Sequence, residues 1–205
     1  MGEIILLRHG PTDWAVQGRH TGRTDQPLNA DGEQRARAVA AVLAGRKIVA
    51  AWSSPAIRAQ RTAELAGLPV QGTDPDLWEW DYGGYEGRTT AQIQQERPGW
   101  YLWTDGVVPG GPNGFPGESA DQVGERCDRV IARVKPLVDP DSATKLAGDV
   151  ALVAHGHLLR ILAARWLGLP ASGGAHFLLD TASVSALGFE HGRPGIALWN
   201  QITAD

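Results

Sequence analysis

Two apolar segments of the sequence each end at a histidine followed by a glycine. Glu3–Leu7 leads into Arg8 and His9, and Asp149–Ala154 leads into His155. A short apolar run of this kind is typical of a buried strand, which would hold the side chain at its end rigidly. A neutral imidazole is a competent nucleophile toward phosphorus, and a neighbouring guanidinium can stabilise the charge on phosphoryl oxygens. The two segments therefore indicate phosphoryl transfer, with satisfied histidines at two strand ends as the alternative.

A third apolar segment, Lys47–Trp52, is followed by residues suited to an anion site. Ser54 can cap a helix, Pro55 can occupy its first position, and Arg58 then lies about one turn in. A helix N-terminus and a nearby arginine together attract an anion. The alternative, an exposed arginine paired along the helix, is weak, because Glu64 is six residues away and helical pairs are spaced by three or four. The sequence therefore favours an anion site that includes Arg58, with the structural explanation as the weaker alternative.

Three acidic residues are candidates for the general acid that a leaving alcohol needs. Glu79 lies between Trp78 and Trp80 in a stretch that continues into several glycines, and desolvation there can keep a carboxyl group protonated near neutrality. Asp81 and Glu86 lie close by and are rivals on spacing alone. The residue pattern by itself leaves the three candidates open.

The composition restricts the functional classes. The chain has 205 residues, 42% hydrophobic and 20% charged, which suits one globular domain with a sizeable core. A net charge of −4 argues against general binding to nucleic acid or an anionic membrane, and no apolar run is long enough to span a bilayer.

The single cysteine, Cys127, cannot form an internal disulfide, and the N-terminus lacks the features of a signal peptide, so we expect a cytoplasmic protein. The excess of arginine, 16 against three lysines, is consistent with phosphate recognition or with compositional bias.

The order of the elements predicts an α/β fold. Besides the three apolar strands, the pattern predicts a loop over 11–28, helices over 29–43, 54–65, 89–96, 119–137 and 156–167, and a terminal hairpin of strands 183–189 and 196–202. This alternation predicts a three-layer domain spanning residues 1–205, with a mostly parallel sheet, helices on both faces and an antiparallel edge. Ligands of such sheets bind beyond the carboxyl ends of the strands, where the candidate residues lie.

Taken in order, the motifs resemble those of the histidine phosphatase superfamily, which has the phosphoglycerate-mutase-like fold. The matching residues run from residue 4 to the terminal hairpin and include Arg8-His9-Gly10, Thr21-Gly22, Ser53-Ser54-Pro55 with Arg58, Glu79 with Tyr82 and Glu86-Gly87, Gly117-Glu118-Ser119, and His155-Gly156-His157. Each motif alone is modest, but six in the family's order are specific. Around residues 18–22, 103–106 and 189–192, the sequence is also similar to that of bacterial broad-specificity acid phosphatases and fungal sedoheptulose-1,7-bisphosphatase.

The resemblance implies a two-step reaction that needs no metal or other cofactor. His9 would attack phosphorus and carry the phosphoryl group, while Glu79 would protonate the leaving alcohol and then activate water. The phosphoryl oxygens would be bound by Arg8, Arg58 and His155. The weaker expectations for substrate contacts are Thr21, Gly22, Tyr82, Ser119, Gly156 and His157. Arg61, Arg88 and Arg160 are candidates for a supporting role, whereas His20 and His176 lie in loops and receive none. The substrate would be a small phosphate monoester, such as a sugar phosphate or bisphosphate.

Two other functions remain open within the resemblance. A cofactor-dependent phosphoglycerate mutase usually carries a longer and more basic insertion after the glutamate loop. Here 30 residues separate Gly87 from Glu118 and contain no lysine, which favours water as the acceptor and hence hydrolysis. A non-catalytic phospho-ligand binding module would lack one of the five catalytic positions, and this chain has all five.

Residues 80–118 are expected to form a loop or lid over the site. Aromatic residues gather in and beside this stretch, namely Trp78, Trp80, Tyr82, Tyr85, Trp100, Tyr101 and Trp103. An apolar lid and a small satellite core account for them equally well. The oligomeric state is not indicated.

Overall fold

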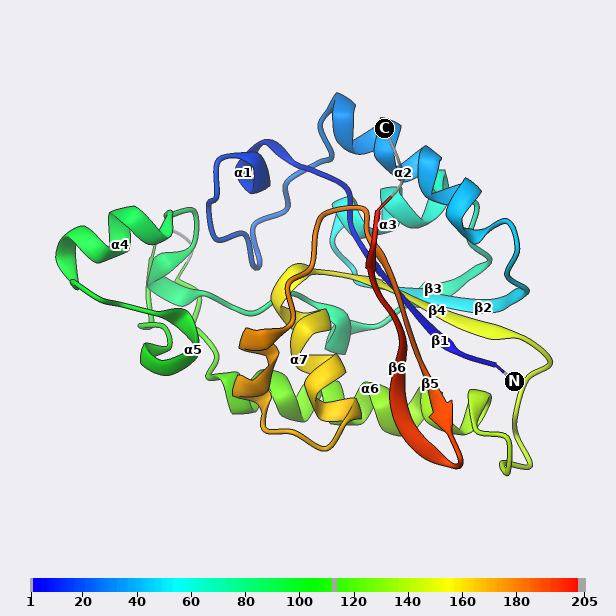
Figure 1. Cartoon of the computed structure of the whole chain (residues 1–205). Coiled ribbons are helices and arrows are strands. Elements are labelled where there is room, and N and C mark those ends of the chain that lie inside the picture. The colour runs from blue at the N-terminus through cyan, green and yellow to red at the C-terminus, as the bar shows by residue number, and fades with distance from the viewer. Residues whose placement is uncertain (1, 112–113, 203–205) are drawn as a thin grey trace.

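A six-stranded sheet runs through the centre of the molecule, with its strands in the order β3-β2-β4-β1-β5-β6 (Figure 1). The strands are β1 (Ile4–Arg8), β2 (Ile48–Ser53), β3 (Val70–Thr73), β4 (Asp149–Ala154), β5 (Val184–Glu190) and β6 (Arg193–Gln201). The first four strands of that order are parallel, whereas β5 runs antiparallel to β1 and β6 antiparallel to β5. The computed structural model describes residues 2–111 and 114–202.

Helices cover both faces of this sheet. One face carries α2 (Ala30–Leu43) and α3 (Ile57–Leu65), and the other carries α6 (Ala120–Val138) and α7 (Gly156–Trp166) (Figure 1). Successive residues of a strand point to opposite faces. Thus β1 gives Ile5 and Leu7 to the core under α2 and α3, and Ile4 and Leu6 to the core under α6 and α7. The predicted three-layer fold with a mostly parallel sheet and an antiparallel edge is confirmed.

Most predicted elements occur within a few residues of their expected bounds, including α4 (Thr90–Glu96). The prediction of an uninterrupted loop over residues 11–28 is wrong, because α1 (Asp13–Val16) forms a helical turn that the Thr12 hydroxyl caps. The sequence analysis also missed β3 and the short helices η1 (Pro75–Leu77), η2 (Gly83–Tyr85), α5 (Leu102–Asp105) and η3 (Ala171–His176). Elements of three to six residues are too short to display a hydrophobic period.

Helix α3 begins later than predicted. Ala56 is its N-cap and Ile57 its first residue, so Ser54 does not cap it. The Ile57 N–H donates instead to Oδ1 of Asp25, at 2.9 Å. The carboxylate of Asp25, from a distant loop, therefore accepts the hydrogen bond at this helix N-terminus that was expected to go to the Ser54 hydroxyl.

The aromatic residues of the 78–103 segment belong mainly to the core. Trp80, Tyr85 and Trp100 are almost fully buried and join the apolar cluster under α6 and α7. The helices α4 and α5 of this segment extend beyond the sheet, at the left of Figure 1. Packing therefore accounts for most of these rings, and the structure favours the core interpretation over an apolar lid.

The carboxyl ends of three neighbouring parallel strands meet at one edge of the sheet. The register of β1 and β4 pairs Arg8 with Ala154, and the N–H of His9 then donates to the Ala154 carbonyl at 2.9 Å. On the other side of β4, Ser53 pairs with Val153. The residues that follow β2 and β4 therefore emerge beside His9.

The segment after β1 packs against the first turn of α2 without room for a side chain. A Cβ on Gly32 would lie 2.1 Å from the carbonyl oxygen of Pro11, and a Cβ on Gly10 would lie 2.6 Å from the carbonyl oxygen of Gly32. Because Gly32 lies within the helix, close approach rather than backbone freedom requires glycine there.

Replacing Gly32 by alanine should destabilise the protein, although a glycine-to-alanine change inside a helix usually stabilises it by about 1 kcal/mol. The new Cβ would press on backbone that cannot rotate away. We expect the free energy of unfolding, measured by urea denaturation, to fall by about 1–3 kcal/mol. Gly45→Ala is the control, because a Cβ at Gly45 meets no atom within 4 Å. Equal effects of the two changes would contradict the packing argument.

Candidate active site

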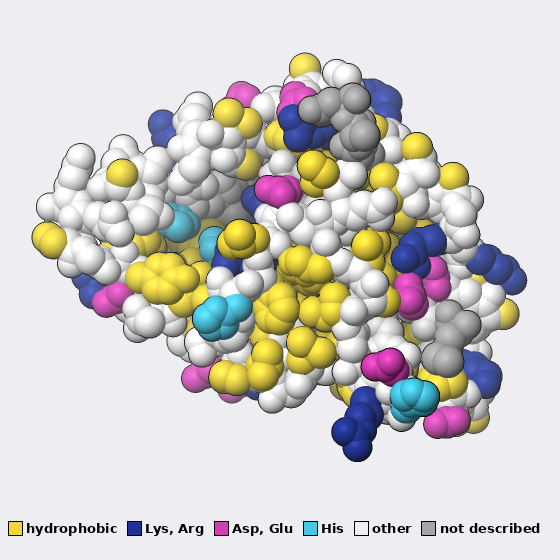
Figure 2. Space-filling model, in the orientation of Figure 1, with side chains coloured by type: hydrophobic (Ala, Val, Ile, Leu, Met, Phe, Trp, Pro, Cys, Tyr) yellow, Lys and Arg dark blue, Asp and Glu magenta, His cyan; other side chains and the backbone are white. Residues whose placement is uncertain are grey.

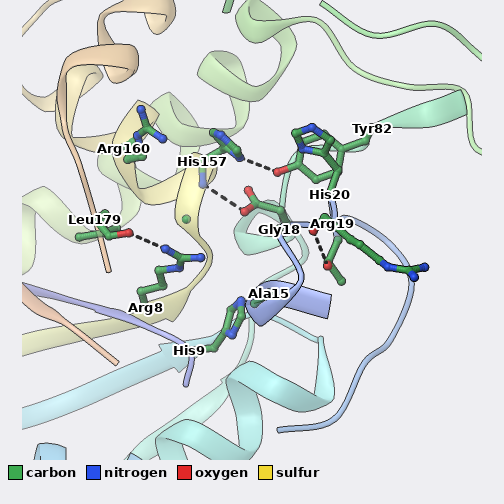
Figure 3. A pocket seen from close by; sticks show the side chains of 13 residues that line it. Arg8, His9, Ala15, Gly18, Arg19, His20, Tyr82, His157, Arg160 and Leu179 are labelled. Carbon is green, nitrogen blue, oxygen red and sulfur yellow. Dashed lines mark hydrogen bonds between the residues drawn. The ribbon is translucent and has the colours of Figure 1, made fainter. Parts of the chain in front are cut away.

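A cavity of about 200 Å³ opens beside the ends of β1 and β4. Figure 2 shows a hollow on this face, where histidine and basic side chains lie among hydrophobic ones. Three of the predicted catalytic residues line the cavity, namely Arg8, His9 and Glu79. Four predicted substrate contacts line it as well, namely Thr21, Tyr82, Gly156 and His157. In Figure 3, Arg8 and His9 occupy one side of the cavity, opposite His157 and Tyr82. Tyr82 is the only described residue of the 80–118 segment that lines it.

His9 presents one free ring nitrogen. Its Nδ1 lies 2.7 Å from the carbonyl oxygen of Gly10, which can only accept, so Nδ1 carries the proton and Nε2 keeps its lone pair. Burial, followed by the positive charges of Arg58 and Arg8, holds the pKa of His9 well below its usual range. The imidazole is therefore neutral near pH 7, as a nucleophile must be.

Buried nitrogen atoms without partners surround this histidine. In the described part of the chain, four buried side-chain nitrogen or oxygen atoms lack a hydrogen-bond partner, and three of them belong to Arg8 (Nε), Arg58 (Nε) and His155 (Nδ1). The His155 ring lies 5.2 Å from that of His9, centroid to centroid. Unpaired buried polar atoms are rare and costly in native proteins, so this cluster indicates a binding site for a polar ligand.

The contacts of His155 allow a tautomer that suits an anion. Its Nε2 lies 2.7 Å from the hydroxyl oxygen of Ser54, which in turn accepts the N–H of Ala56 at 3.3 Å. A hydroxyl can donate its own proton while it accepts another, so Ser54 can donate to Nε2. In that tautomer the proton of His155 lies on the unpaired Nδ1, where it can be donated to an anion.

Arg58 is fully buried rather than exposed on its helix. Its Nη1 donates to the carbonyl oxygen of Thr24 at 3.1 Å, and its Nη2 to those of Gly22 at 2.9 Å and Thr21 at 3.3 Å. Thr21 and Gly22 thus hold Arg58 through their backbone. This is their observed role, besides the contribution of Thr21 to the cavity wall.

Glu86 fixes the loop that holds Arg58. Its carboxylate accepts the N–H of Gly22 at 2.9 Å and that of Thr24 at 3.1 Å. Burial raises the pKa of Glu86, although these N–H donors act in the opposite direction. Because its oxygens are engaged in the loop, Glu86 is a supporting residue of the site and not a wall of the cavity.

The structure separates the three candidates for the general acid. The Glu79 carboxylate lines the cavity and accepts the N–H groups of His157 at 3.1 Å and Leu158 at 2.9 Å, in the first turn of α7. The Asp81 carboxylate accepts a backbone N–H of its own turn. Neither Asp81 nor Glu86 is among the described residues that line the cavity. Of the three acids, only Glu79 lines the cavity that His9 also lines.

The other predicted substrate contacts lie in different places. The Tyr82 hydroxyl and His157 Nδ1 are 2.6 Å apart and form part of the cavity wall. A Cβ on Gly156 would come within 3.2 Å of Cζ and Nε of Arg8, so this glycine lets the guanidinium lie close to the backbone. Ser119 is not brought to the cavity, since its hydroxyl caps α6 by accepting the N–H of Gln122 at 3.2 Å.

His20 is a residue of the site that the sequence analysis missed. It lines the cavity, its ring lies 4.9 Å from that of Tyr82, and burial lowers its pKa to about 4. The loop around His20 has no periodicity, so only the matching Gly18–Gly22 segment could have pointed to it.

Of the three supporting arginines, only Arg160 reaches the cavity. Its guanidinium donates to the carbonyl oxygens of Gly174 at 3.0 Å and Ala175 at 3.1 Å, and lies 4.7 Å from the Trp103 ring centroid. Arg61 forms ion pairs with Glu33 and Glu64 at the surface, and Arg88 pairs with Glu96.

Neither a metal centre nor a membrane span is apparent in residues 2–111 and 114–202. These residues contain no group of three or more His, Cys, Asp or Glu side chains arranged to hold a metal ion. Their helices include none that is long and apolar enough to cross a membrane.

The buried histidines should make stability fall as the pH drops below 6.5, the ordinary pKa of histidine. Burial lowers the pKa values of His9, His20, His155 and His157, to about 4 for His20. Between the lowered values and 6.5, the unfolded chain binds protons that the native chain does not. The free energy of unfolding, measured with urea between about pH 7.5 and about pH 5.5, therefore decreases as the pH falls.

His20→Asn should reduce the slope of the free energy of unfolding against pH by the equivalent of about one proton, because the variant removes one of these histidines. His191→Asn is the matched control, because His191 is exposed and has a positive φ that asparagine tolerates. A slope that His20→Asn leaves unchanged would contradict the argument.

Comparison with known proteins shows the family to which the chain belongs. The sequence model of the histidine phosphatase superfamily (branch 1) matches residues 4–202. An acid phosphatase of Mycobacterium tuberculosis is 39% identical over 191 residues, which cover 92% of this chain and 87% of the relative. Sedoheptulose 1,7-bisphosphatase of Saccharomyces cerevisiae is 36% identical over 190 residues, covering 80% and 67%. A probable phosphoglycerate mutase, GpmB, of Salmonella choleraesuis is 32% identical over 199 residues, covering 93% and 86%.

The fold is shared as well. A solved structure from Mycobacterium tuberculosis superposes with a TM-score of 0.86 at 37% identity, covering 99% of each chain. The match along almost the whole chain, together with relatives named as phosphatases, supports phosphatase activity. By the family match and these identities, the chain belongs to the histidine phosphatase superfamily.

Proposed function

We propose that the chain is a metal-independent phosphatase that hydrolyses small phosphate monoesters through a phosphohistidine on His9. The observation that carries this proposal is the set of buried, unpaired nitrogen atoms of Arg8, Arg58 and His155 next to the free Nε2 of His9. A phosphoryl group would supply the acceptors that these atoms lack, through charge-assisted hydrogen bonds.

In the first step, Nε2 of His9 forms a bond to phosphorus while the bond from phosphorus to the ester oxygen breaks. Arg8, Arg58 and the Nδ1–H of His155 stabilise the charge on the non-bridging oxygens, which is the main demand of phosphoryl transfer. Glu79, in its protonated form, gives its proton to the departing oxygen. The first product is an alcohol, and the phosphoryl group stays on His9.

In the second step, water attacks the phosphohistidine. The Glu79 carboxylate accepts a proton from this water, the bond from Nε2 to phosphorus breaks, and inorganic phosphate forms. The hydrogen bond from Nδ1 to the Gly10 carbonyl keeps the ring oriented through both steps. Neutral His9 and protonated Glu79 are restored, so the cycle closes without a metal.

The cavity wall supports a small, polar substrate. Tyr82 and the neutral rings of His20 and His157 can exchange hydrogen bonds with hydroxyl groups, and Arg160 offers a positive charge away from His9. A volume of about 200 Å³ suits a sugar phosphate better than a nucleotide. We therefore propose a sugar phosphate or bisphosphate, the class to which sedoheptulose 1,7-bisphosphate of the yeast relative belongs.

A phosphoglycerate mutase is the second candidate, because a relative named as a probable mutase matches most of the chain. The two reactions share the first step and differ in whether water or a second substrate hydroxyl accepts the phosphoryl group. A mutase would depend on added bisphosphoglycerate and release little inorganic phosphate. Measurement of both products from 3-phosphoglycerate separates the two functions.

His9→Asn should abolish phosphate release from p-nitrophenyl phosphate and from a panel of sugar phosphates. Loss of the nucleophile should lower kcat/KM by roughly three orders of magnitude or more. His191→Asn is the same change at an exposed turn and should keep full activity. Unchanged turnover in His9→Asn, or wild-type activity that EDTA removes and a divalent metal restores, would reject the scheme. Binding of phosphate without turnover would indicate a non-catalytic module.

Glu79→Gln should slow the hydrolysis of esters with poor leaving groups more than that of p-nitrophenyl phosphate, because nitrophenolate departs without protonation. For alkyl phosphates we expect kcat/KM to fall by roughly 10²–10⁴. The ratio of the two kcat/KM values isolates the protonation step, since both include the same attack by His9. Equal slowing of both esters would show that Glu79 is not the acid.

A further inference from the structure

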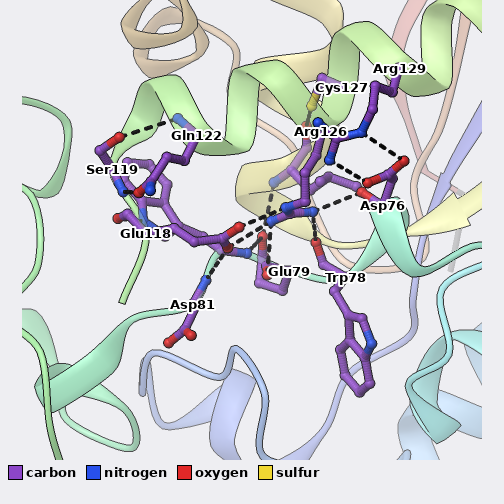
Figure 4. Close-up of polar contacts among 12 residues, drawn as sticks. Asp76, Trp78, Glu79, Asp81, Glu118, Ser119, Gln122, Arg126, Cys127 and Arg129 are labelled. Carbon is purple, nitrogen blue, oxygen red and sulfur yellow. Dashed lines mark hydrogen bonds and ion pairs between the residues drawn. The ribbon is translucent and has the colours of Figure 1, made fainter. Parts of the chain in front are cut away.

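Arg126, on α6, makes hydrogen bonds with all five N–H groups of its guanidinium (Figure 4). Nη1 donates to the carbonyl oxygens of Asp76 at 2.7 Å and Trp78 at 2.8 Å, and Nη2 donates to that of Glu79 at 3.3 Å. Nε and Nη2 also donate to the two carboxylate oxygens of Glu118, at 2.7 Å and 2.8 Å. Arg126 as a whole residue is 7% exposed and does not line the cavity.

Glu118 forms hydrogen bonds with the residues on the other side of Glu79. Its Oε2 accepts the N–H of Asp81 at 2.9 Å, and its own N–H donates to the Asp81 carbonyl at 2.9 Å. Its carbonyl accepts Nε1 of Trp80 at 2.7 Å. The backbone before Glu79 is therefore bonded to Arg126 directly, and the backbone after it is bonded through Glu118.

The 78–82 segment needs such support, because it belongs to neither a helix nor a strand. Buried carbonyl groups outside regular structure must find partners elsewhere. A planar guanidinium can serve several of them at fixed angles, which a single ammonium cannot. The Glu79 carboxylate touches the first turn of α7, but the position of its Cα depends on these carbonyl contacts.

We propose that Arg126, paired with Glu118, is the positioning residue for the general acid Glu79. The inference rests on the proposed function, in which Glu79 moves the proton. Arg126 touches neither His9 nor the cavity, so its loss should leave the attack on phosphorus in place and displace the acid. A misplaced catalytic group can lose about a hundredfold in rate. The loss in kcat/KM should appear only for esters whose leaving group needs a proton.

The test compares kcat/KM for an alkyl phosphate and for p-nitrophenyl phosphate in Arg126→Met and Arg126→Lys. The ratio of the two values does not depend on the fraction of folded protein, so a poorly stable variant still gives an answer. Arg129→Met is the matched control. Arg129 also lies on α6 and also contacts Asp76, but it is exposed and bonds only to the side-chain carboxylate.

We expect the alkyl-to-nitrophenyl ratio to fall roughly ten- to a hundredfold in Arg126→Met. The ratio for Arg126→Lys should lie between those of Arg126→Met and the wild type, because a lysine keeps the charge opposite Glu118 but has fewer donors. The control should keep the wild-type ratio. If Glu79→Gln shifts the ratio and Arg126→Met does not, Arg126 is only structural and the inference is overturned. If Glu79→Gln itself leaves the ratio unchanged, the proposed role of Glu79 fails, and the inference fails with it.

Discussion

The burial of positively charged and hydrogen-bond-donating groups is the constraint on which the rest of the structure depends. Arg8, Arg58 and His155 each keep one buried nitrogen without a partner. Each such atom costs about 1–3 kcal/mol. The fold tolerates that cost because the three groups come from the ends of neighbouring strands or from the helix that follows one. The sheet prevents them from moving apart and finding water.

The carbonyl groups around Arg58 show how the same constraint shapes a loop. Three backbone oxygens of the 21–24 segment accept from its guanidinium, and Glu86 fixes that segment through the N–H groups of Gly22 and Thr24. A Cβ on Gly22 would lie 2.4 Å from the Trp80 carbonyl oxygen, so this loop also presses against the backbone beside Glu79. The loop that holds Arg58 and the segment that carries Glu79 are thus packed as one unit.

The sequence predicts the residues at strand ends well, because an apolar run and its last residue are local features. In this way the sequence predicts His9 and His155 as site residues, and the register of three adjacent strands brings them to the same edge of the sheet. His20 and Arg126 were missed because their roles depend on contacts between distant segments, such as the carbonyl groups of residues 76–79 meeting a helix some 50 residues later. The choice between Glu79, Asp81 and Glu86 also required three dimensions, since only the direction of each carboxylate separates them.

In the proposed function, the two helix N-termini at the site explain why side chains bind the phosphate. A free helix N-terminus is a ready anion site, and the sequence predicts one at the start of α3. Protein carboxylates already occupy these positions, Asp25 at the first N–H of α3 and Glu79 at the first turn of α7. The backbone donors that commonly cradle phosphate are therefore engaged. The donors that remain for a phosphate are those of guanidinium and imidazole groups, which do not depend on a helix end. In the proposed function, the α7 terminus therefore orients Glu79, while the side chains of Arg8, Arg58 and His155 bind the phosphate.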